Sequence, residues 1–352
     1  MVDFAGWSMP VQYTSIVDEH HAIRRAVGVF DVSHMGRLRF DGGDAARFLD
    51  RVLTRRVTDL PIGKIRYSLV TNRQGGILDD ILVSHFETPS GRRYHLMVVN
   101  ASNREKIVSW LQEQLNDFHG DVEMSDRTID TAMIAVQGPE SAKVLEPLVK
   151  TKLDELGYYC GEVTEHLGRP CTITRTGYTG EDGFELIVRA EEALDTWKNI
   201  FRAGRDSGVT AAGLGARDTL RMEAAMPLYG HELTEQINPY QAGLGFAVNL
   251  KDRDFVGRDA LLEFKADKDQ PKRIGLKMAG RRVPREDFAV LSDGQRVGQV
   301  TSGTFSPTLQ QPIAMAYVQP AAAATDTELT VEIRGRYEPA QVVKLPFYQR
   351  AR

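Results

Sequence analysis

The order of apolar and polar positions predicts short strands along most of the chain, with amphipathic helices between them. Residues 15–33, SIVDEHHAIRRAVGVFDVS, have the spacing of a helix, with Ser15 as its N-cap and Ile23 and Val27 on one face. We expect the polar run EHH at 19–21 to lie on the solvent-exposed side of this helix.

Residues 65–87, IRYSLVTNRQGGILDDILVSHFE, predict a β-hairpin that turns at TNRQGG. Its second strand carries Asp79 and Asp80 within an apolar run. Because side chains alternate along a strand, the two carboxylates should point to opposite faces, Asp79 with Ile77 and Asp80 with Leu78. Burial of an unpaired carboxylate is costly, so at least one of them must meet a strong partner, a cavity or a ligand.

The second half of the chain changes character at residues 263–273, EFKADKDQPKR, a charged segment that we interpret as a domain boundary. Before it, residues 169–190 predict one long strand interrupted by glycines. After it, short strands and turns dominate, and Asp293-Gly294 marks a hairpin. The pattern favours an α+β fold with antiparallel sheets, followed by a small β-barrel or jelly roll.

Composition and charge exclude some classes of protein function. The chain has 352 residues, of which 42% are hydrophobic and 26% charged, and 44 basic residues against 48 acidic ones give a net charge of -4. This balance argues against a nucleic-acid binder. No signal peptide or membrane span is predicted, and Cys160 and Cys171 are expected to be reduced, so we expect a cytoplasmic protein.

Nucleotide-binding, nucleophile-elbow and zinc-protease motifs are absent from the sequence. The glycines of GYTGEDGFEL, 177–186, would let the backbone adopt positive φ or let a flat ligand approach it closely. Glu185 would accept two N–H bonds from a pterin-like edge; a structural Glu–Arg pair is the alternative. Arg217 and Arg221 share one helical face, where surface salt bridges are the alternative to a site. His34 is expected to be a hydrogen-bonded structural histidine.

Taken together, these segments resemble the T-protein family, the aminomethyltransferases of the glycine cleavage system. The matching blocks occur in order over almost the whole chain: MVDFAGWSMPVQY, GVFDVSHMG, YSLVTNRQGGILDDILV, VVNASN, GYTGEDGFE, GLGARDTLRMEAAMPLYGHEL, NPYQAGLGFAV, VTSGTFSPTLQQPIAMAYV and KLPFY.

The resemblance implies a multi-domain α+β fold with three lobes in a ring around a central folate channel. Residues 1–265 would form the folate-binding region of two interleaved α+β lobes, and residues 273–352 the C-terminal β-barrel domain.

The resemblance also implies a reaction. A dihydrolipoyl group on a partner, the lipoylated H-protein, carries an aminomethyl group on sulfur. The enzyme would release ammonia and pass the one-carbon unit to its co-substrate tetrahydrofolate, giving 5,10-methylenetetrahydrofolate. No metal, nucleic acid or membrane is implied.

Carried over by position, the resemblance makes Asp80 the catalytic carboxylate and leaves Asp79 a structural role. The substrate- and folate-binding residues that it implies are Tyr67, Val99, Asn100, Tyr178, Glu185, Arg217 and Tyr348.

Two alternatives share the same fold. One is a folate-dependent demethylase, against which DVSHMG and PLYGHEL favour the T-protein. The other is a non-catalytic folate-binding protein that assists iron–sulfur assembly, whose characteristic cysteine motif matches neither Cys160 nor Cys171.

Overall fold

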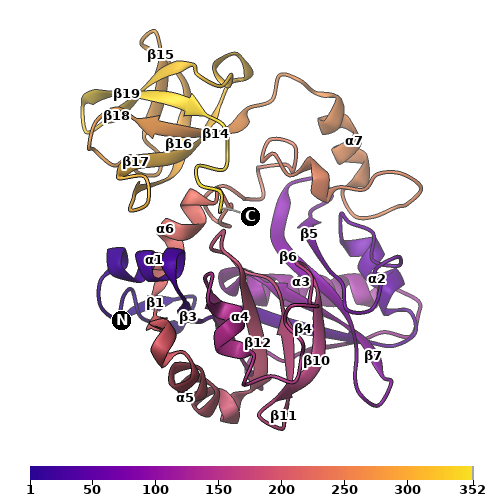
Figure 1. Ribbon diagram of the computed structural model, residues 1–352. Helices are drawn as coiled ribbons and strands as arrows, with labels where there is room; N and C mark the ends of the chain where they lie inside the picture. Colours follow the sequence, from indigo (N-terminus) through magenta and orange to yellow (C-terminus); the bar gives the residue numbers. More distant parts are fainter. Residues whose placement is uncertain (351–352) are drawn as a thin grey trace.

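A computed structural model describes residues 1–350 and contains two mixed layers of sheet and helix and a closed barrel (Figure 1). The first sheet has the strand order β5-β6-β7-β4-β8 and is antiparallel throughout. Its strands are β4 (Gly36–Asp41), β5 (Ile65–Thr71), β6 (Ile77–Glu87), β7 (Arg93–Val99) and β8 (Glu123–Asp126).

The second sheet has the order β10-β11-β12-β9-β3-β13 and is antiparallel except where β13 joins β3. Its strands are β3 (Gly28–Asp31), β9 (Thr131–Gln137), β10 (Gly161–His166), β11 (Arg169–Thr174), β12 (Gly183–Arg189) and β13 (Thr210–Ala211). Because β3 precedes the whole first sheet in the chain, the two layers interleave in sequence. A short hairpin, β1 (Val2–Phe4) and β2 (Trp7–Met9), lies at the N-terminus.

The barrel closes in the order β14-β17-β16-β15-β18-β19. Its strands are β14 (Lys272–Met278), β15 (Ala289–Ser292), β16 (Gln295–Ser306), β17 (Gln311–Val318), β18 (Glu328–Ile333) and β19 (Arg336–Val343). The expected turn at Asp293-Gly294 joins β15 to β16, and Gly294 has the positive φ of 76° that such a turn requires. The α+β fold with a C-terminal barrel is confirmed.

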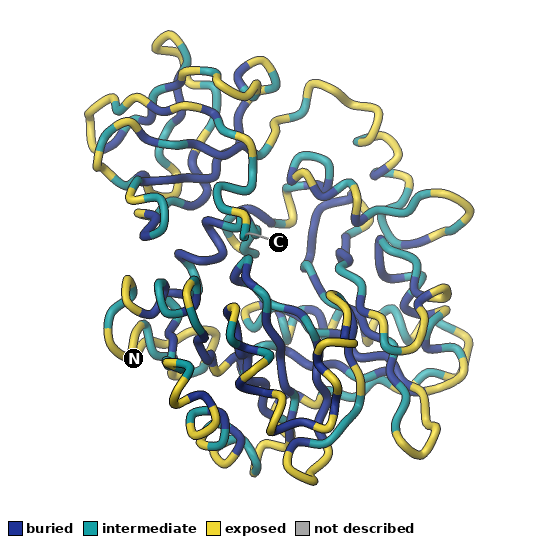
Figure 2. Tube along the Cα trace, in the orientation of Figure 1, coloured by how far each residue is buried: buried dark blue, intermediate teal, exposed yellow. Residues whose placement is uncertain are grey.

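The helices cover the outer faces of the sheets and connect them to the barrel. α6 packs against α1 and against barrel strands β16 and β17. Figure 2 shows buried residues along the strands and exposed ones in loops and on the outer helix faces. The α-helices are α1 (Ile16–Arg25), α2 (Ala45–Val52), α3 (Arg104–Asn116), α4 (Ser141–Leu145), α5 (Ala193–Ala203), α6 (Leu214–Glu223) and α7 (Arg258–Ala266). Short 3-10 turns are Ala101–Asn103, Ala190–Glu192, Arg205–Ser207, Gly245–Ala247 and Pro320–Ala322.

Two predicted elements are shorter than expected. Ser15 caps α1 as predicted, but the helix ends at Arg25, since residues 28–31 pair with β9 as strand β3. Residues 169–190 form two strands, β11 and β12, because the glycine-rich segment between them folds back and the strands pair with each other. In both places tertiary pairing overrides the local pattern.

The EHH run was expected at the surface, and this prediction is wrong for its first two residues. Glu19 and His20 are fully buried. Glu19 accepts hydrogen bonds from backbone N–H groups of residues 13, 14 and 213, and His20 bonds the hydroxyls of Thr219 and Thr308. Buried polar groups are tolerated where every one finds a partner. Residues 13 and 14 are close to Glu19 in the sequence, whereas residues 213, 219 and 308 are distant.

The pairing of β5 with β6 contains a bulge that skips Leu78. A bulge interrupts the alternation of side chains. Leu78 packs in the same core as Ile81, whereas Ile77 belongs to a different cluster. The predicted grouping of Ile77 with Asp79 and of Leu78 with Asp80 is therefore wrong. Among residues 1–350, no helix is long and apolar enough to cross a bilayer.

Candidate functional site

A cavity of about 320 Å³ lies where the two sheets and the barrel meet. The first sheet contributes Tyr67 and Asp80, the second contributes Glu185, and the barrel contributes Arg273 from β14. Five of the predicted site residues line this cavity together with Asp80: Tyr67, Asn100, Tyr178, Glu185 and Arg217. Tertiary structure thus brings together side chains from parts of the chain more than a hundred residues apart.

Asp80 faces the cavity and is held by two donors. The Tyr67 hydroxyl donates to Oδ2 over 3.1 Å, and the Asn100 side-chain amide donates to Oδ1 over 2.8 Å. Burial raises the pKa of Asp80, while these two hydrogen bonds and the charge of Arg273 act in the opposite direction. The result is a partly desolvated carboxylate that still favours hydrogen-bond donors and positive charge in front of it.

Asp79 is fully buried and borders no cavity that contains Asp80. It accepts three hydrogen bonds, from the backbone N–H of Asn100 and from the side-chain amides of Asn100 and Asn103. Burial raises the pKa of Asp79, and the charge of Asp80 raises it further. The two carboxylates therefore share one amide donor, Asn100, from opposite faces of β6.

Glu185 lies in the cavity wall on the face of β12 opposite Phe184 and Leu186, which pack in the core as predicted. Thr176 donates to its Oε2 over 2.5 Å. Burial raises the pKa of Glu185, and the hydrogen bond from Thr176 and the charge of Arg217 lower it. No lysine, arginine or histidine of residues 1–350 forms a salt bridge with Glu185, so the alternative of a structural Glu–Arg pair is not what the structure contains.

Among the glycines before Glu185, Gly180 has the expected positive φ of 81°, and two others make room for a buried side chain. A Cβ at Gly177 or Gly183 would collide with the side chain of Gln137. Gln137 in turn donates to the Thr176 carbonyl over 3.0 Å and accepts from the Thr179 hydroxyl over 2.9 Å. The glycines therefore admit a buried side chain that fixes the loop beside the cavity.

Arg217 and Arg221 differ in their surroundings, although both lie on α6. The Arg217 guanidinium stacks on the Tyr178 ring at 4.6 Å and borders the cavity. Arg221 is buried and forms ion pairs of 2.8 Å with Glu232 and Asp218, so a surface salt bridge is the wrong description of it. Burial lowers the pKa of Arg217. Its planar cation is the one on this helix available to a ligand.

A second cavity of about 800 Å³ adjoins the first. The two share the lining residues Met35, Asn100, Tyr178, Arg217 and Leu228. His34 lines the second cavity, is almost fully buried and has no hydrogen-bond partner at Nδ1, so the expected hydrogen-bonded structural role is wrong. Burial, with Arg217 and Arg37 nearby, lowers the pKa of His34 to about 3, which keeps the imidazole neutral.

Two of the predicted site residues lie outside the cavity wall. The Val99 side chain is fully buried in the core of the first sheet. Tyr348 packs its ring against the Arg24 guanidinium at 4.0 Å, and its backbone N–H donates to the carbonyl of Glu223.

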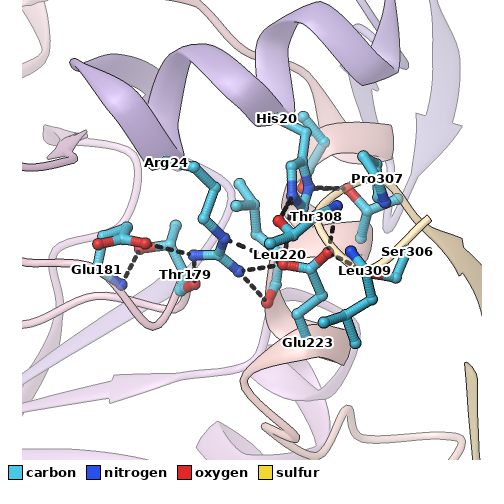
Figure 3. A network of polar contacts seen from close by, with 12 residues as sticks. His20, Arg24, Thr179, Glu181, Leu220, Glu223, Ser306, Pro307, Thr308 and Leu309 are labelled. Atoms are coloured by element: carbon cyan, nitrogen blue, oxygen red, sulfur yellow. Dashed lines mark hydrogen bonds and ion pairs between the residues drawn. The ribbon is translucent and has the colours of Figure 1, made fainter. Parts of the chain in front are cut away.

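Arg24 belongs to a buried ion network that joins α1, α6 and the barrel (Figure 3). Its guanidinium pairs with Glu223 over 2.8 Å and with Glu181 over 2.9 Å. His20 lies 3.3 Å from the Glu223 carboxylate. Arg24 also donates to the carbonyl of Thr179, in the loop that carries Tyr178. The network therefore fixes one wall of the cavity and the position of the barrel at once.

Sequence patterns did not reveal three residues that border the cavity. Arg273 ends the charged segment 263–273 that we interpret as a domain boundary, Tyr159 follows another tyrosine in a loop, and Phe246 stacks on Tyr67 with ring centroids 6.0 Å apart. No local signal distinguishes them, because only the approach of the barrel and of the loop 240–247 brings them to the site. Within residues 1–350, no group of three or more His, Cys, Asp or Glu side chains is arranged to hold a metal ion.

Residues 1–252 match the family model of the GCVT N-terminal domain, and residues 272–349 match the glycine cleavage T-protein C-terminal barrel domain. The chain belongs to the glycine cleavage T-protein family. The predicted resemblance is thereby confirmed.

Relatives of this family are similar over almost their whole length. An aminomethyltransferase of Moorella thermoacetica is 46% identical over 350 residues, covering 99% of this chain and 94% of that protein. One of Streptomyces coelicolor is 46% identical over 355 residues, with the same coverage of both chains. The crystal structure of glycine cleavage system aminomethyltransferase T from Bartonella henselae superposes with a TM-score of 0.90 at 33% identity, covering 99% of this chain and 94% of that one. The predicted enzyme class, a one-carbon transferase, is confirmed by these relatives.

Proposed function

We propose that this member of the T-protein family transfers the one-carbon unit of an S-aminomethyl-dihydrolipoyl group, carried by the H-protein, to tetrahydrofolate. The products are 5,10-methylenetetrahydrofolate, ammonia and the dihydrolipoyl thiol. The observation that carries the proposal is the half-buried carboxylate of Asp80, held by Tyr67 and Asn100 and facing a cavity bordered by all three parts of the fold.

The chemistry requires two bonds to the carbon to break, one to nitrogen and one to sulfur, and two bonds to folate nitrogens to form. The two protons that leave the folate nitrogens balance those gained by ammonia and the thiol. The carbon passes through an iminium-like cation. A desolvated carboxylate at Asp80 would orient the folate amine, accept its proton and stabilise the cation. The donors Tyr67 and Asn100 hold the carboxylate in place during these steps.

The folate ring is assigned to the wall that contains Glu185. Its carboxylate, fixed through one oxygen by Thr176, would accept two N–H bonds from the amidine edge of the pterin. Arg217, stacked on Tyr178, would contact the ligand from the opposite side. Apolar neighbours such as Met133 and Leu244 would limit water access to the reacting carbon.

Residues 1–265 are proposed as the folate-binding region and 273–352 as a separate barrel domain. The first family model ends at residue 252 and the second begins at residue 272, and both bounds support this division. The lipoylated H-protein is the proposed partner, since it brings the aminomethyl group in this family.

The deciding experiment is a single-turnover assay with aminomethyl-loaded H-protein, with and without tetrahydrofolate, that measures 5,10-methylenetetrahydrofolate. We expect folate-dependent product from the wild type and a loss of about 100-fold or more in Asp80→Asn. Asp41→Asn is a matched control, because Asp41 is a carboxylate of the same sheet that pairs with Arg39 and does not border the cavity. Formation of product from a methylated amine in place of the H-protein adduct would favour the demethylase instead.

A further inference from the structure

Asp79 is a buried carboxylate for which the proposed reaction has no direct use. No cation of residues 1–350 forms a salt bridge with it, and it does not border the cavity that Asp80 faces. Burial of such a group is costly unless hydrogen bonds compensate it. Its compensation comes from asparagines alone, and one of them, Asn100, also contacts Asp80.

Asn100 is anchored to Asp79 through both its main chain and its side chain. The backbone N–H donates to Oδ2 over 3.0 Å, and the side-chain amide donates to Oδ1 over 2.8 Å. An ionised carboxylate accepts hydrogen bonds and donates none. Asp79 therefore favours the orientation of the Asn100 amide in which its nitrogen points toward the carboxylate pair.

The same amide nitrogen has a second hydrogen, and it donates to Oδ1 of Asp80 over 2.8 Å. If the amide were rotated, its oxygen would face the Asp80 carboxylate and repel it. The amide nitrogen also donates to the backbone carbonyl of Asp80 over 3.2 Å, so its two hydrogens are shared among three acceptors on Asp79 and Asp80. The hydrogen bond from the Asn100 amide to Asp79 and the one to Asp80 therefore require the same orientation of the amide.

We propose that Asp79 is a positioning residue for Asp80, acting through the orientation of the Asn100 amide. This inference rests on the proposed function. It replaces the purely structural role that the sequence suggested for Asp79.

Asp79 also has a structural contact, which an experiment must separate from the positioning role. Asn103, in the turn before α3, donates to Oδ1 of Asp79 over 2.8 Å and to the carbonyl of Leu78 over 3.2 Å. This contact ties the start of α3 to β6; it shares the acceptor Oδ1 with the Asn100 amide but does not touch Asp80. Asn103→Ala is consequently the matched control.

The test compares kcat and KM for tetrahydrofolate in Asp79→Asn, Asn100→Ala, Asn103→Ala and the double variant Asp79→Asn with Asn100→Ala. Each is assayed with loaded H-protein well below its own Tm. We expect Asp79→Asn to lower kcat about 10- to 100-fold, as loss of a supporting hydrogen-bond partner commonly does, with little change in KM. Asn103→Ala should lower Tm and leave kcat unchanged.

The double variant tests most directly whether Asp79 acts through Asn100. If Asp79 acts through Asn100, adding Asp79→Asn to Asn100→Ala costs no further activity. Multiplied losses in the double variant, or a folded Asp79→Asn with wild-type kcat, would overturn the proposal. Should Asp79→Asn not fold, Asp79→Glu, which keeps the charge and moves the acceptor by one methylene, takes its place in the same cycle. An inactive wild type would instead refute the proposed function, so the two failures are distinguishable.

Discussion

The Tyr67 hydroxyl donates a hydrogen bond of 3.1 Å to Oδ2 of Asp80 across the pair of strands β5 and β6. The two residues are not directly opposite one another, since Tyr67 pairs with Leu82 and Asp80 with Leu69. A diagonal contact of this kind is within the reach of an aromatic side chain. Because both residues lie on paired strands of one sheet, the backbone hydrogen bonds of the sheet hold the Tyr67–Asp80 contact in place.

Tyr67→Phe should shift the acid limb of the pH–rate profile upward by about one unit, equivalent to about 1.4 kcal/mol. The hydrogen bond favours the ionised form of Asp80, so its removal raises the pKa of that carboxyl. The stack on Phe246 remains in the variant. Single-turnover rates measured from about pH 5 to pH 9 test this, and an unmoved acid limb would contradict it.

Asp80→Asn should gain stability relative to the wild type as the pH rises. Burial raises the pKa of Asp80 above its unfolded value, so its contribution to stability is complete below about pH 4 and is lost as the pH rises through the folded pKa. An amide at this position does not ionise. Urea unfolding of both proteins between about pH 4 and pH 8 should show a growing difference, and parallel curves would refute the argument.

Glu185→Gln should weaken tetrahydrofolate binding about 10- to 100-fold, since a hydrogen bond to a charged group contributes about 1.5–3 kcal/mol. The substitution conserves volume and keeps one acceptor for Thr176. Titration calorimetry gives the Kd directly. Glu165→Gln is the control, because Glu165 pairs with Lys150 at the outer strand of the same sheet and does not border the cavity. Equal affinities of the wild type and Glu185→Gln would remove Glu185 from the folate site.

Arg24→Met should destabilise the fold by about 3–5 kcal/mol, the usual cost of removing one partner of a buried ion pair. It leaves the Glu223 carboxylate, which is fully buried, without its cation. Thermal unfolding is the measurement. Arg47→Met, which removes an exposed pair with Asp44, should change stability by less than about 1 kcal/mol. Similar losses in both variants would show that the network of Figure 3 contributes no more than a surface pair.

The ion network around Arg24 should also make the free energy of unfolding depend on pH in the acid range. Burial alone would raise the pKa of Glu223, but hydrogen bonds from His20 and Ser306 and the charge of Arg24 lower it to about 2. The stabilisation is therefore present above the unfolded pKa and lost as the pH falls from about 4.5 toward 2. Glu223→Gln should remove this loss of stability at low pH. Thermal unfolding of both proteins, repeated at several pH values between about 2 and 5, is the measurement.

The local features of this protein could be predicted from its sequence. Ser15 caps a helix because its hydroxyl reaches an N–H group three residues away, and Asp293-Gly294 turns a hairpin because glycine tolerates a positive φ. The carboxylates of residues 79 and 80 could be located within a buried strand because the apolar run around them is contiguous. The family could be recognised because the motif blocks occur in the expected order along almost the whole chain.

Which polar residues are buried together depends on how distant elements pack. Local patterns misplaced Glu19 and His20, whose hydrogen-bond partners lie up to 288 residues away. They also missed the bulge at Leu78 and the cavity residue Arg273. The physical reason is that a cap or a tight turn is stabilised by neighbours in sequence, whereas a buried polar group is stabilised by whichever donors and acceptors the packing of distant elements brings to it.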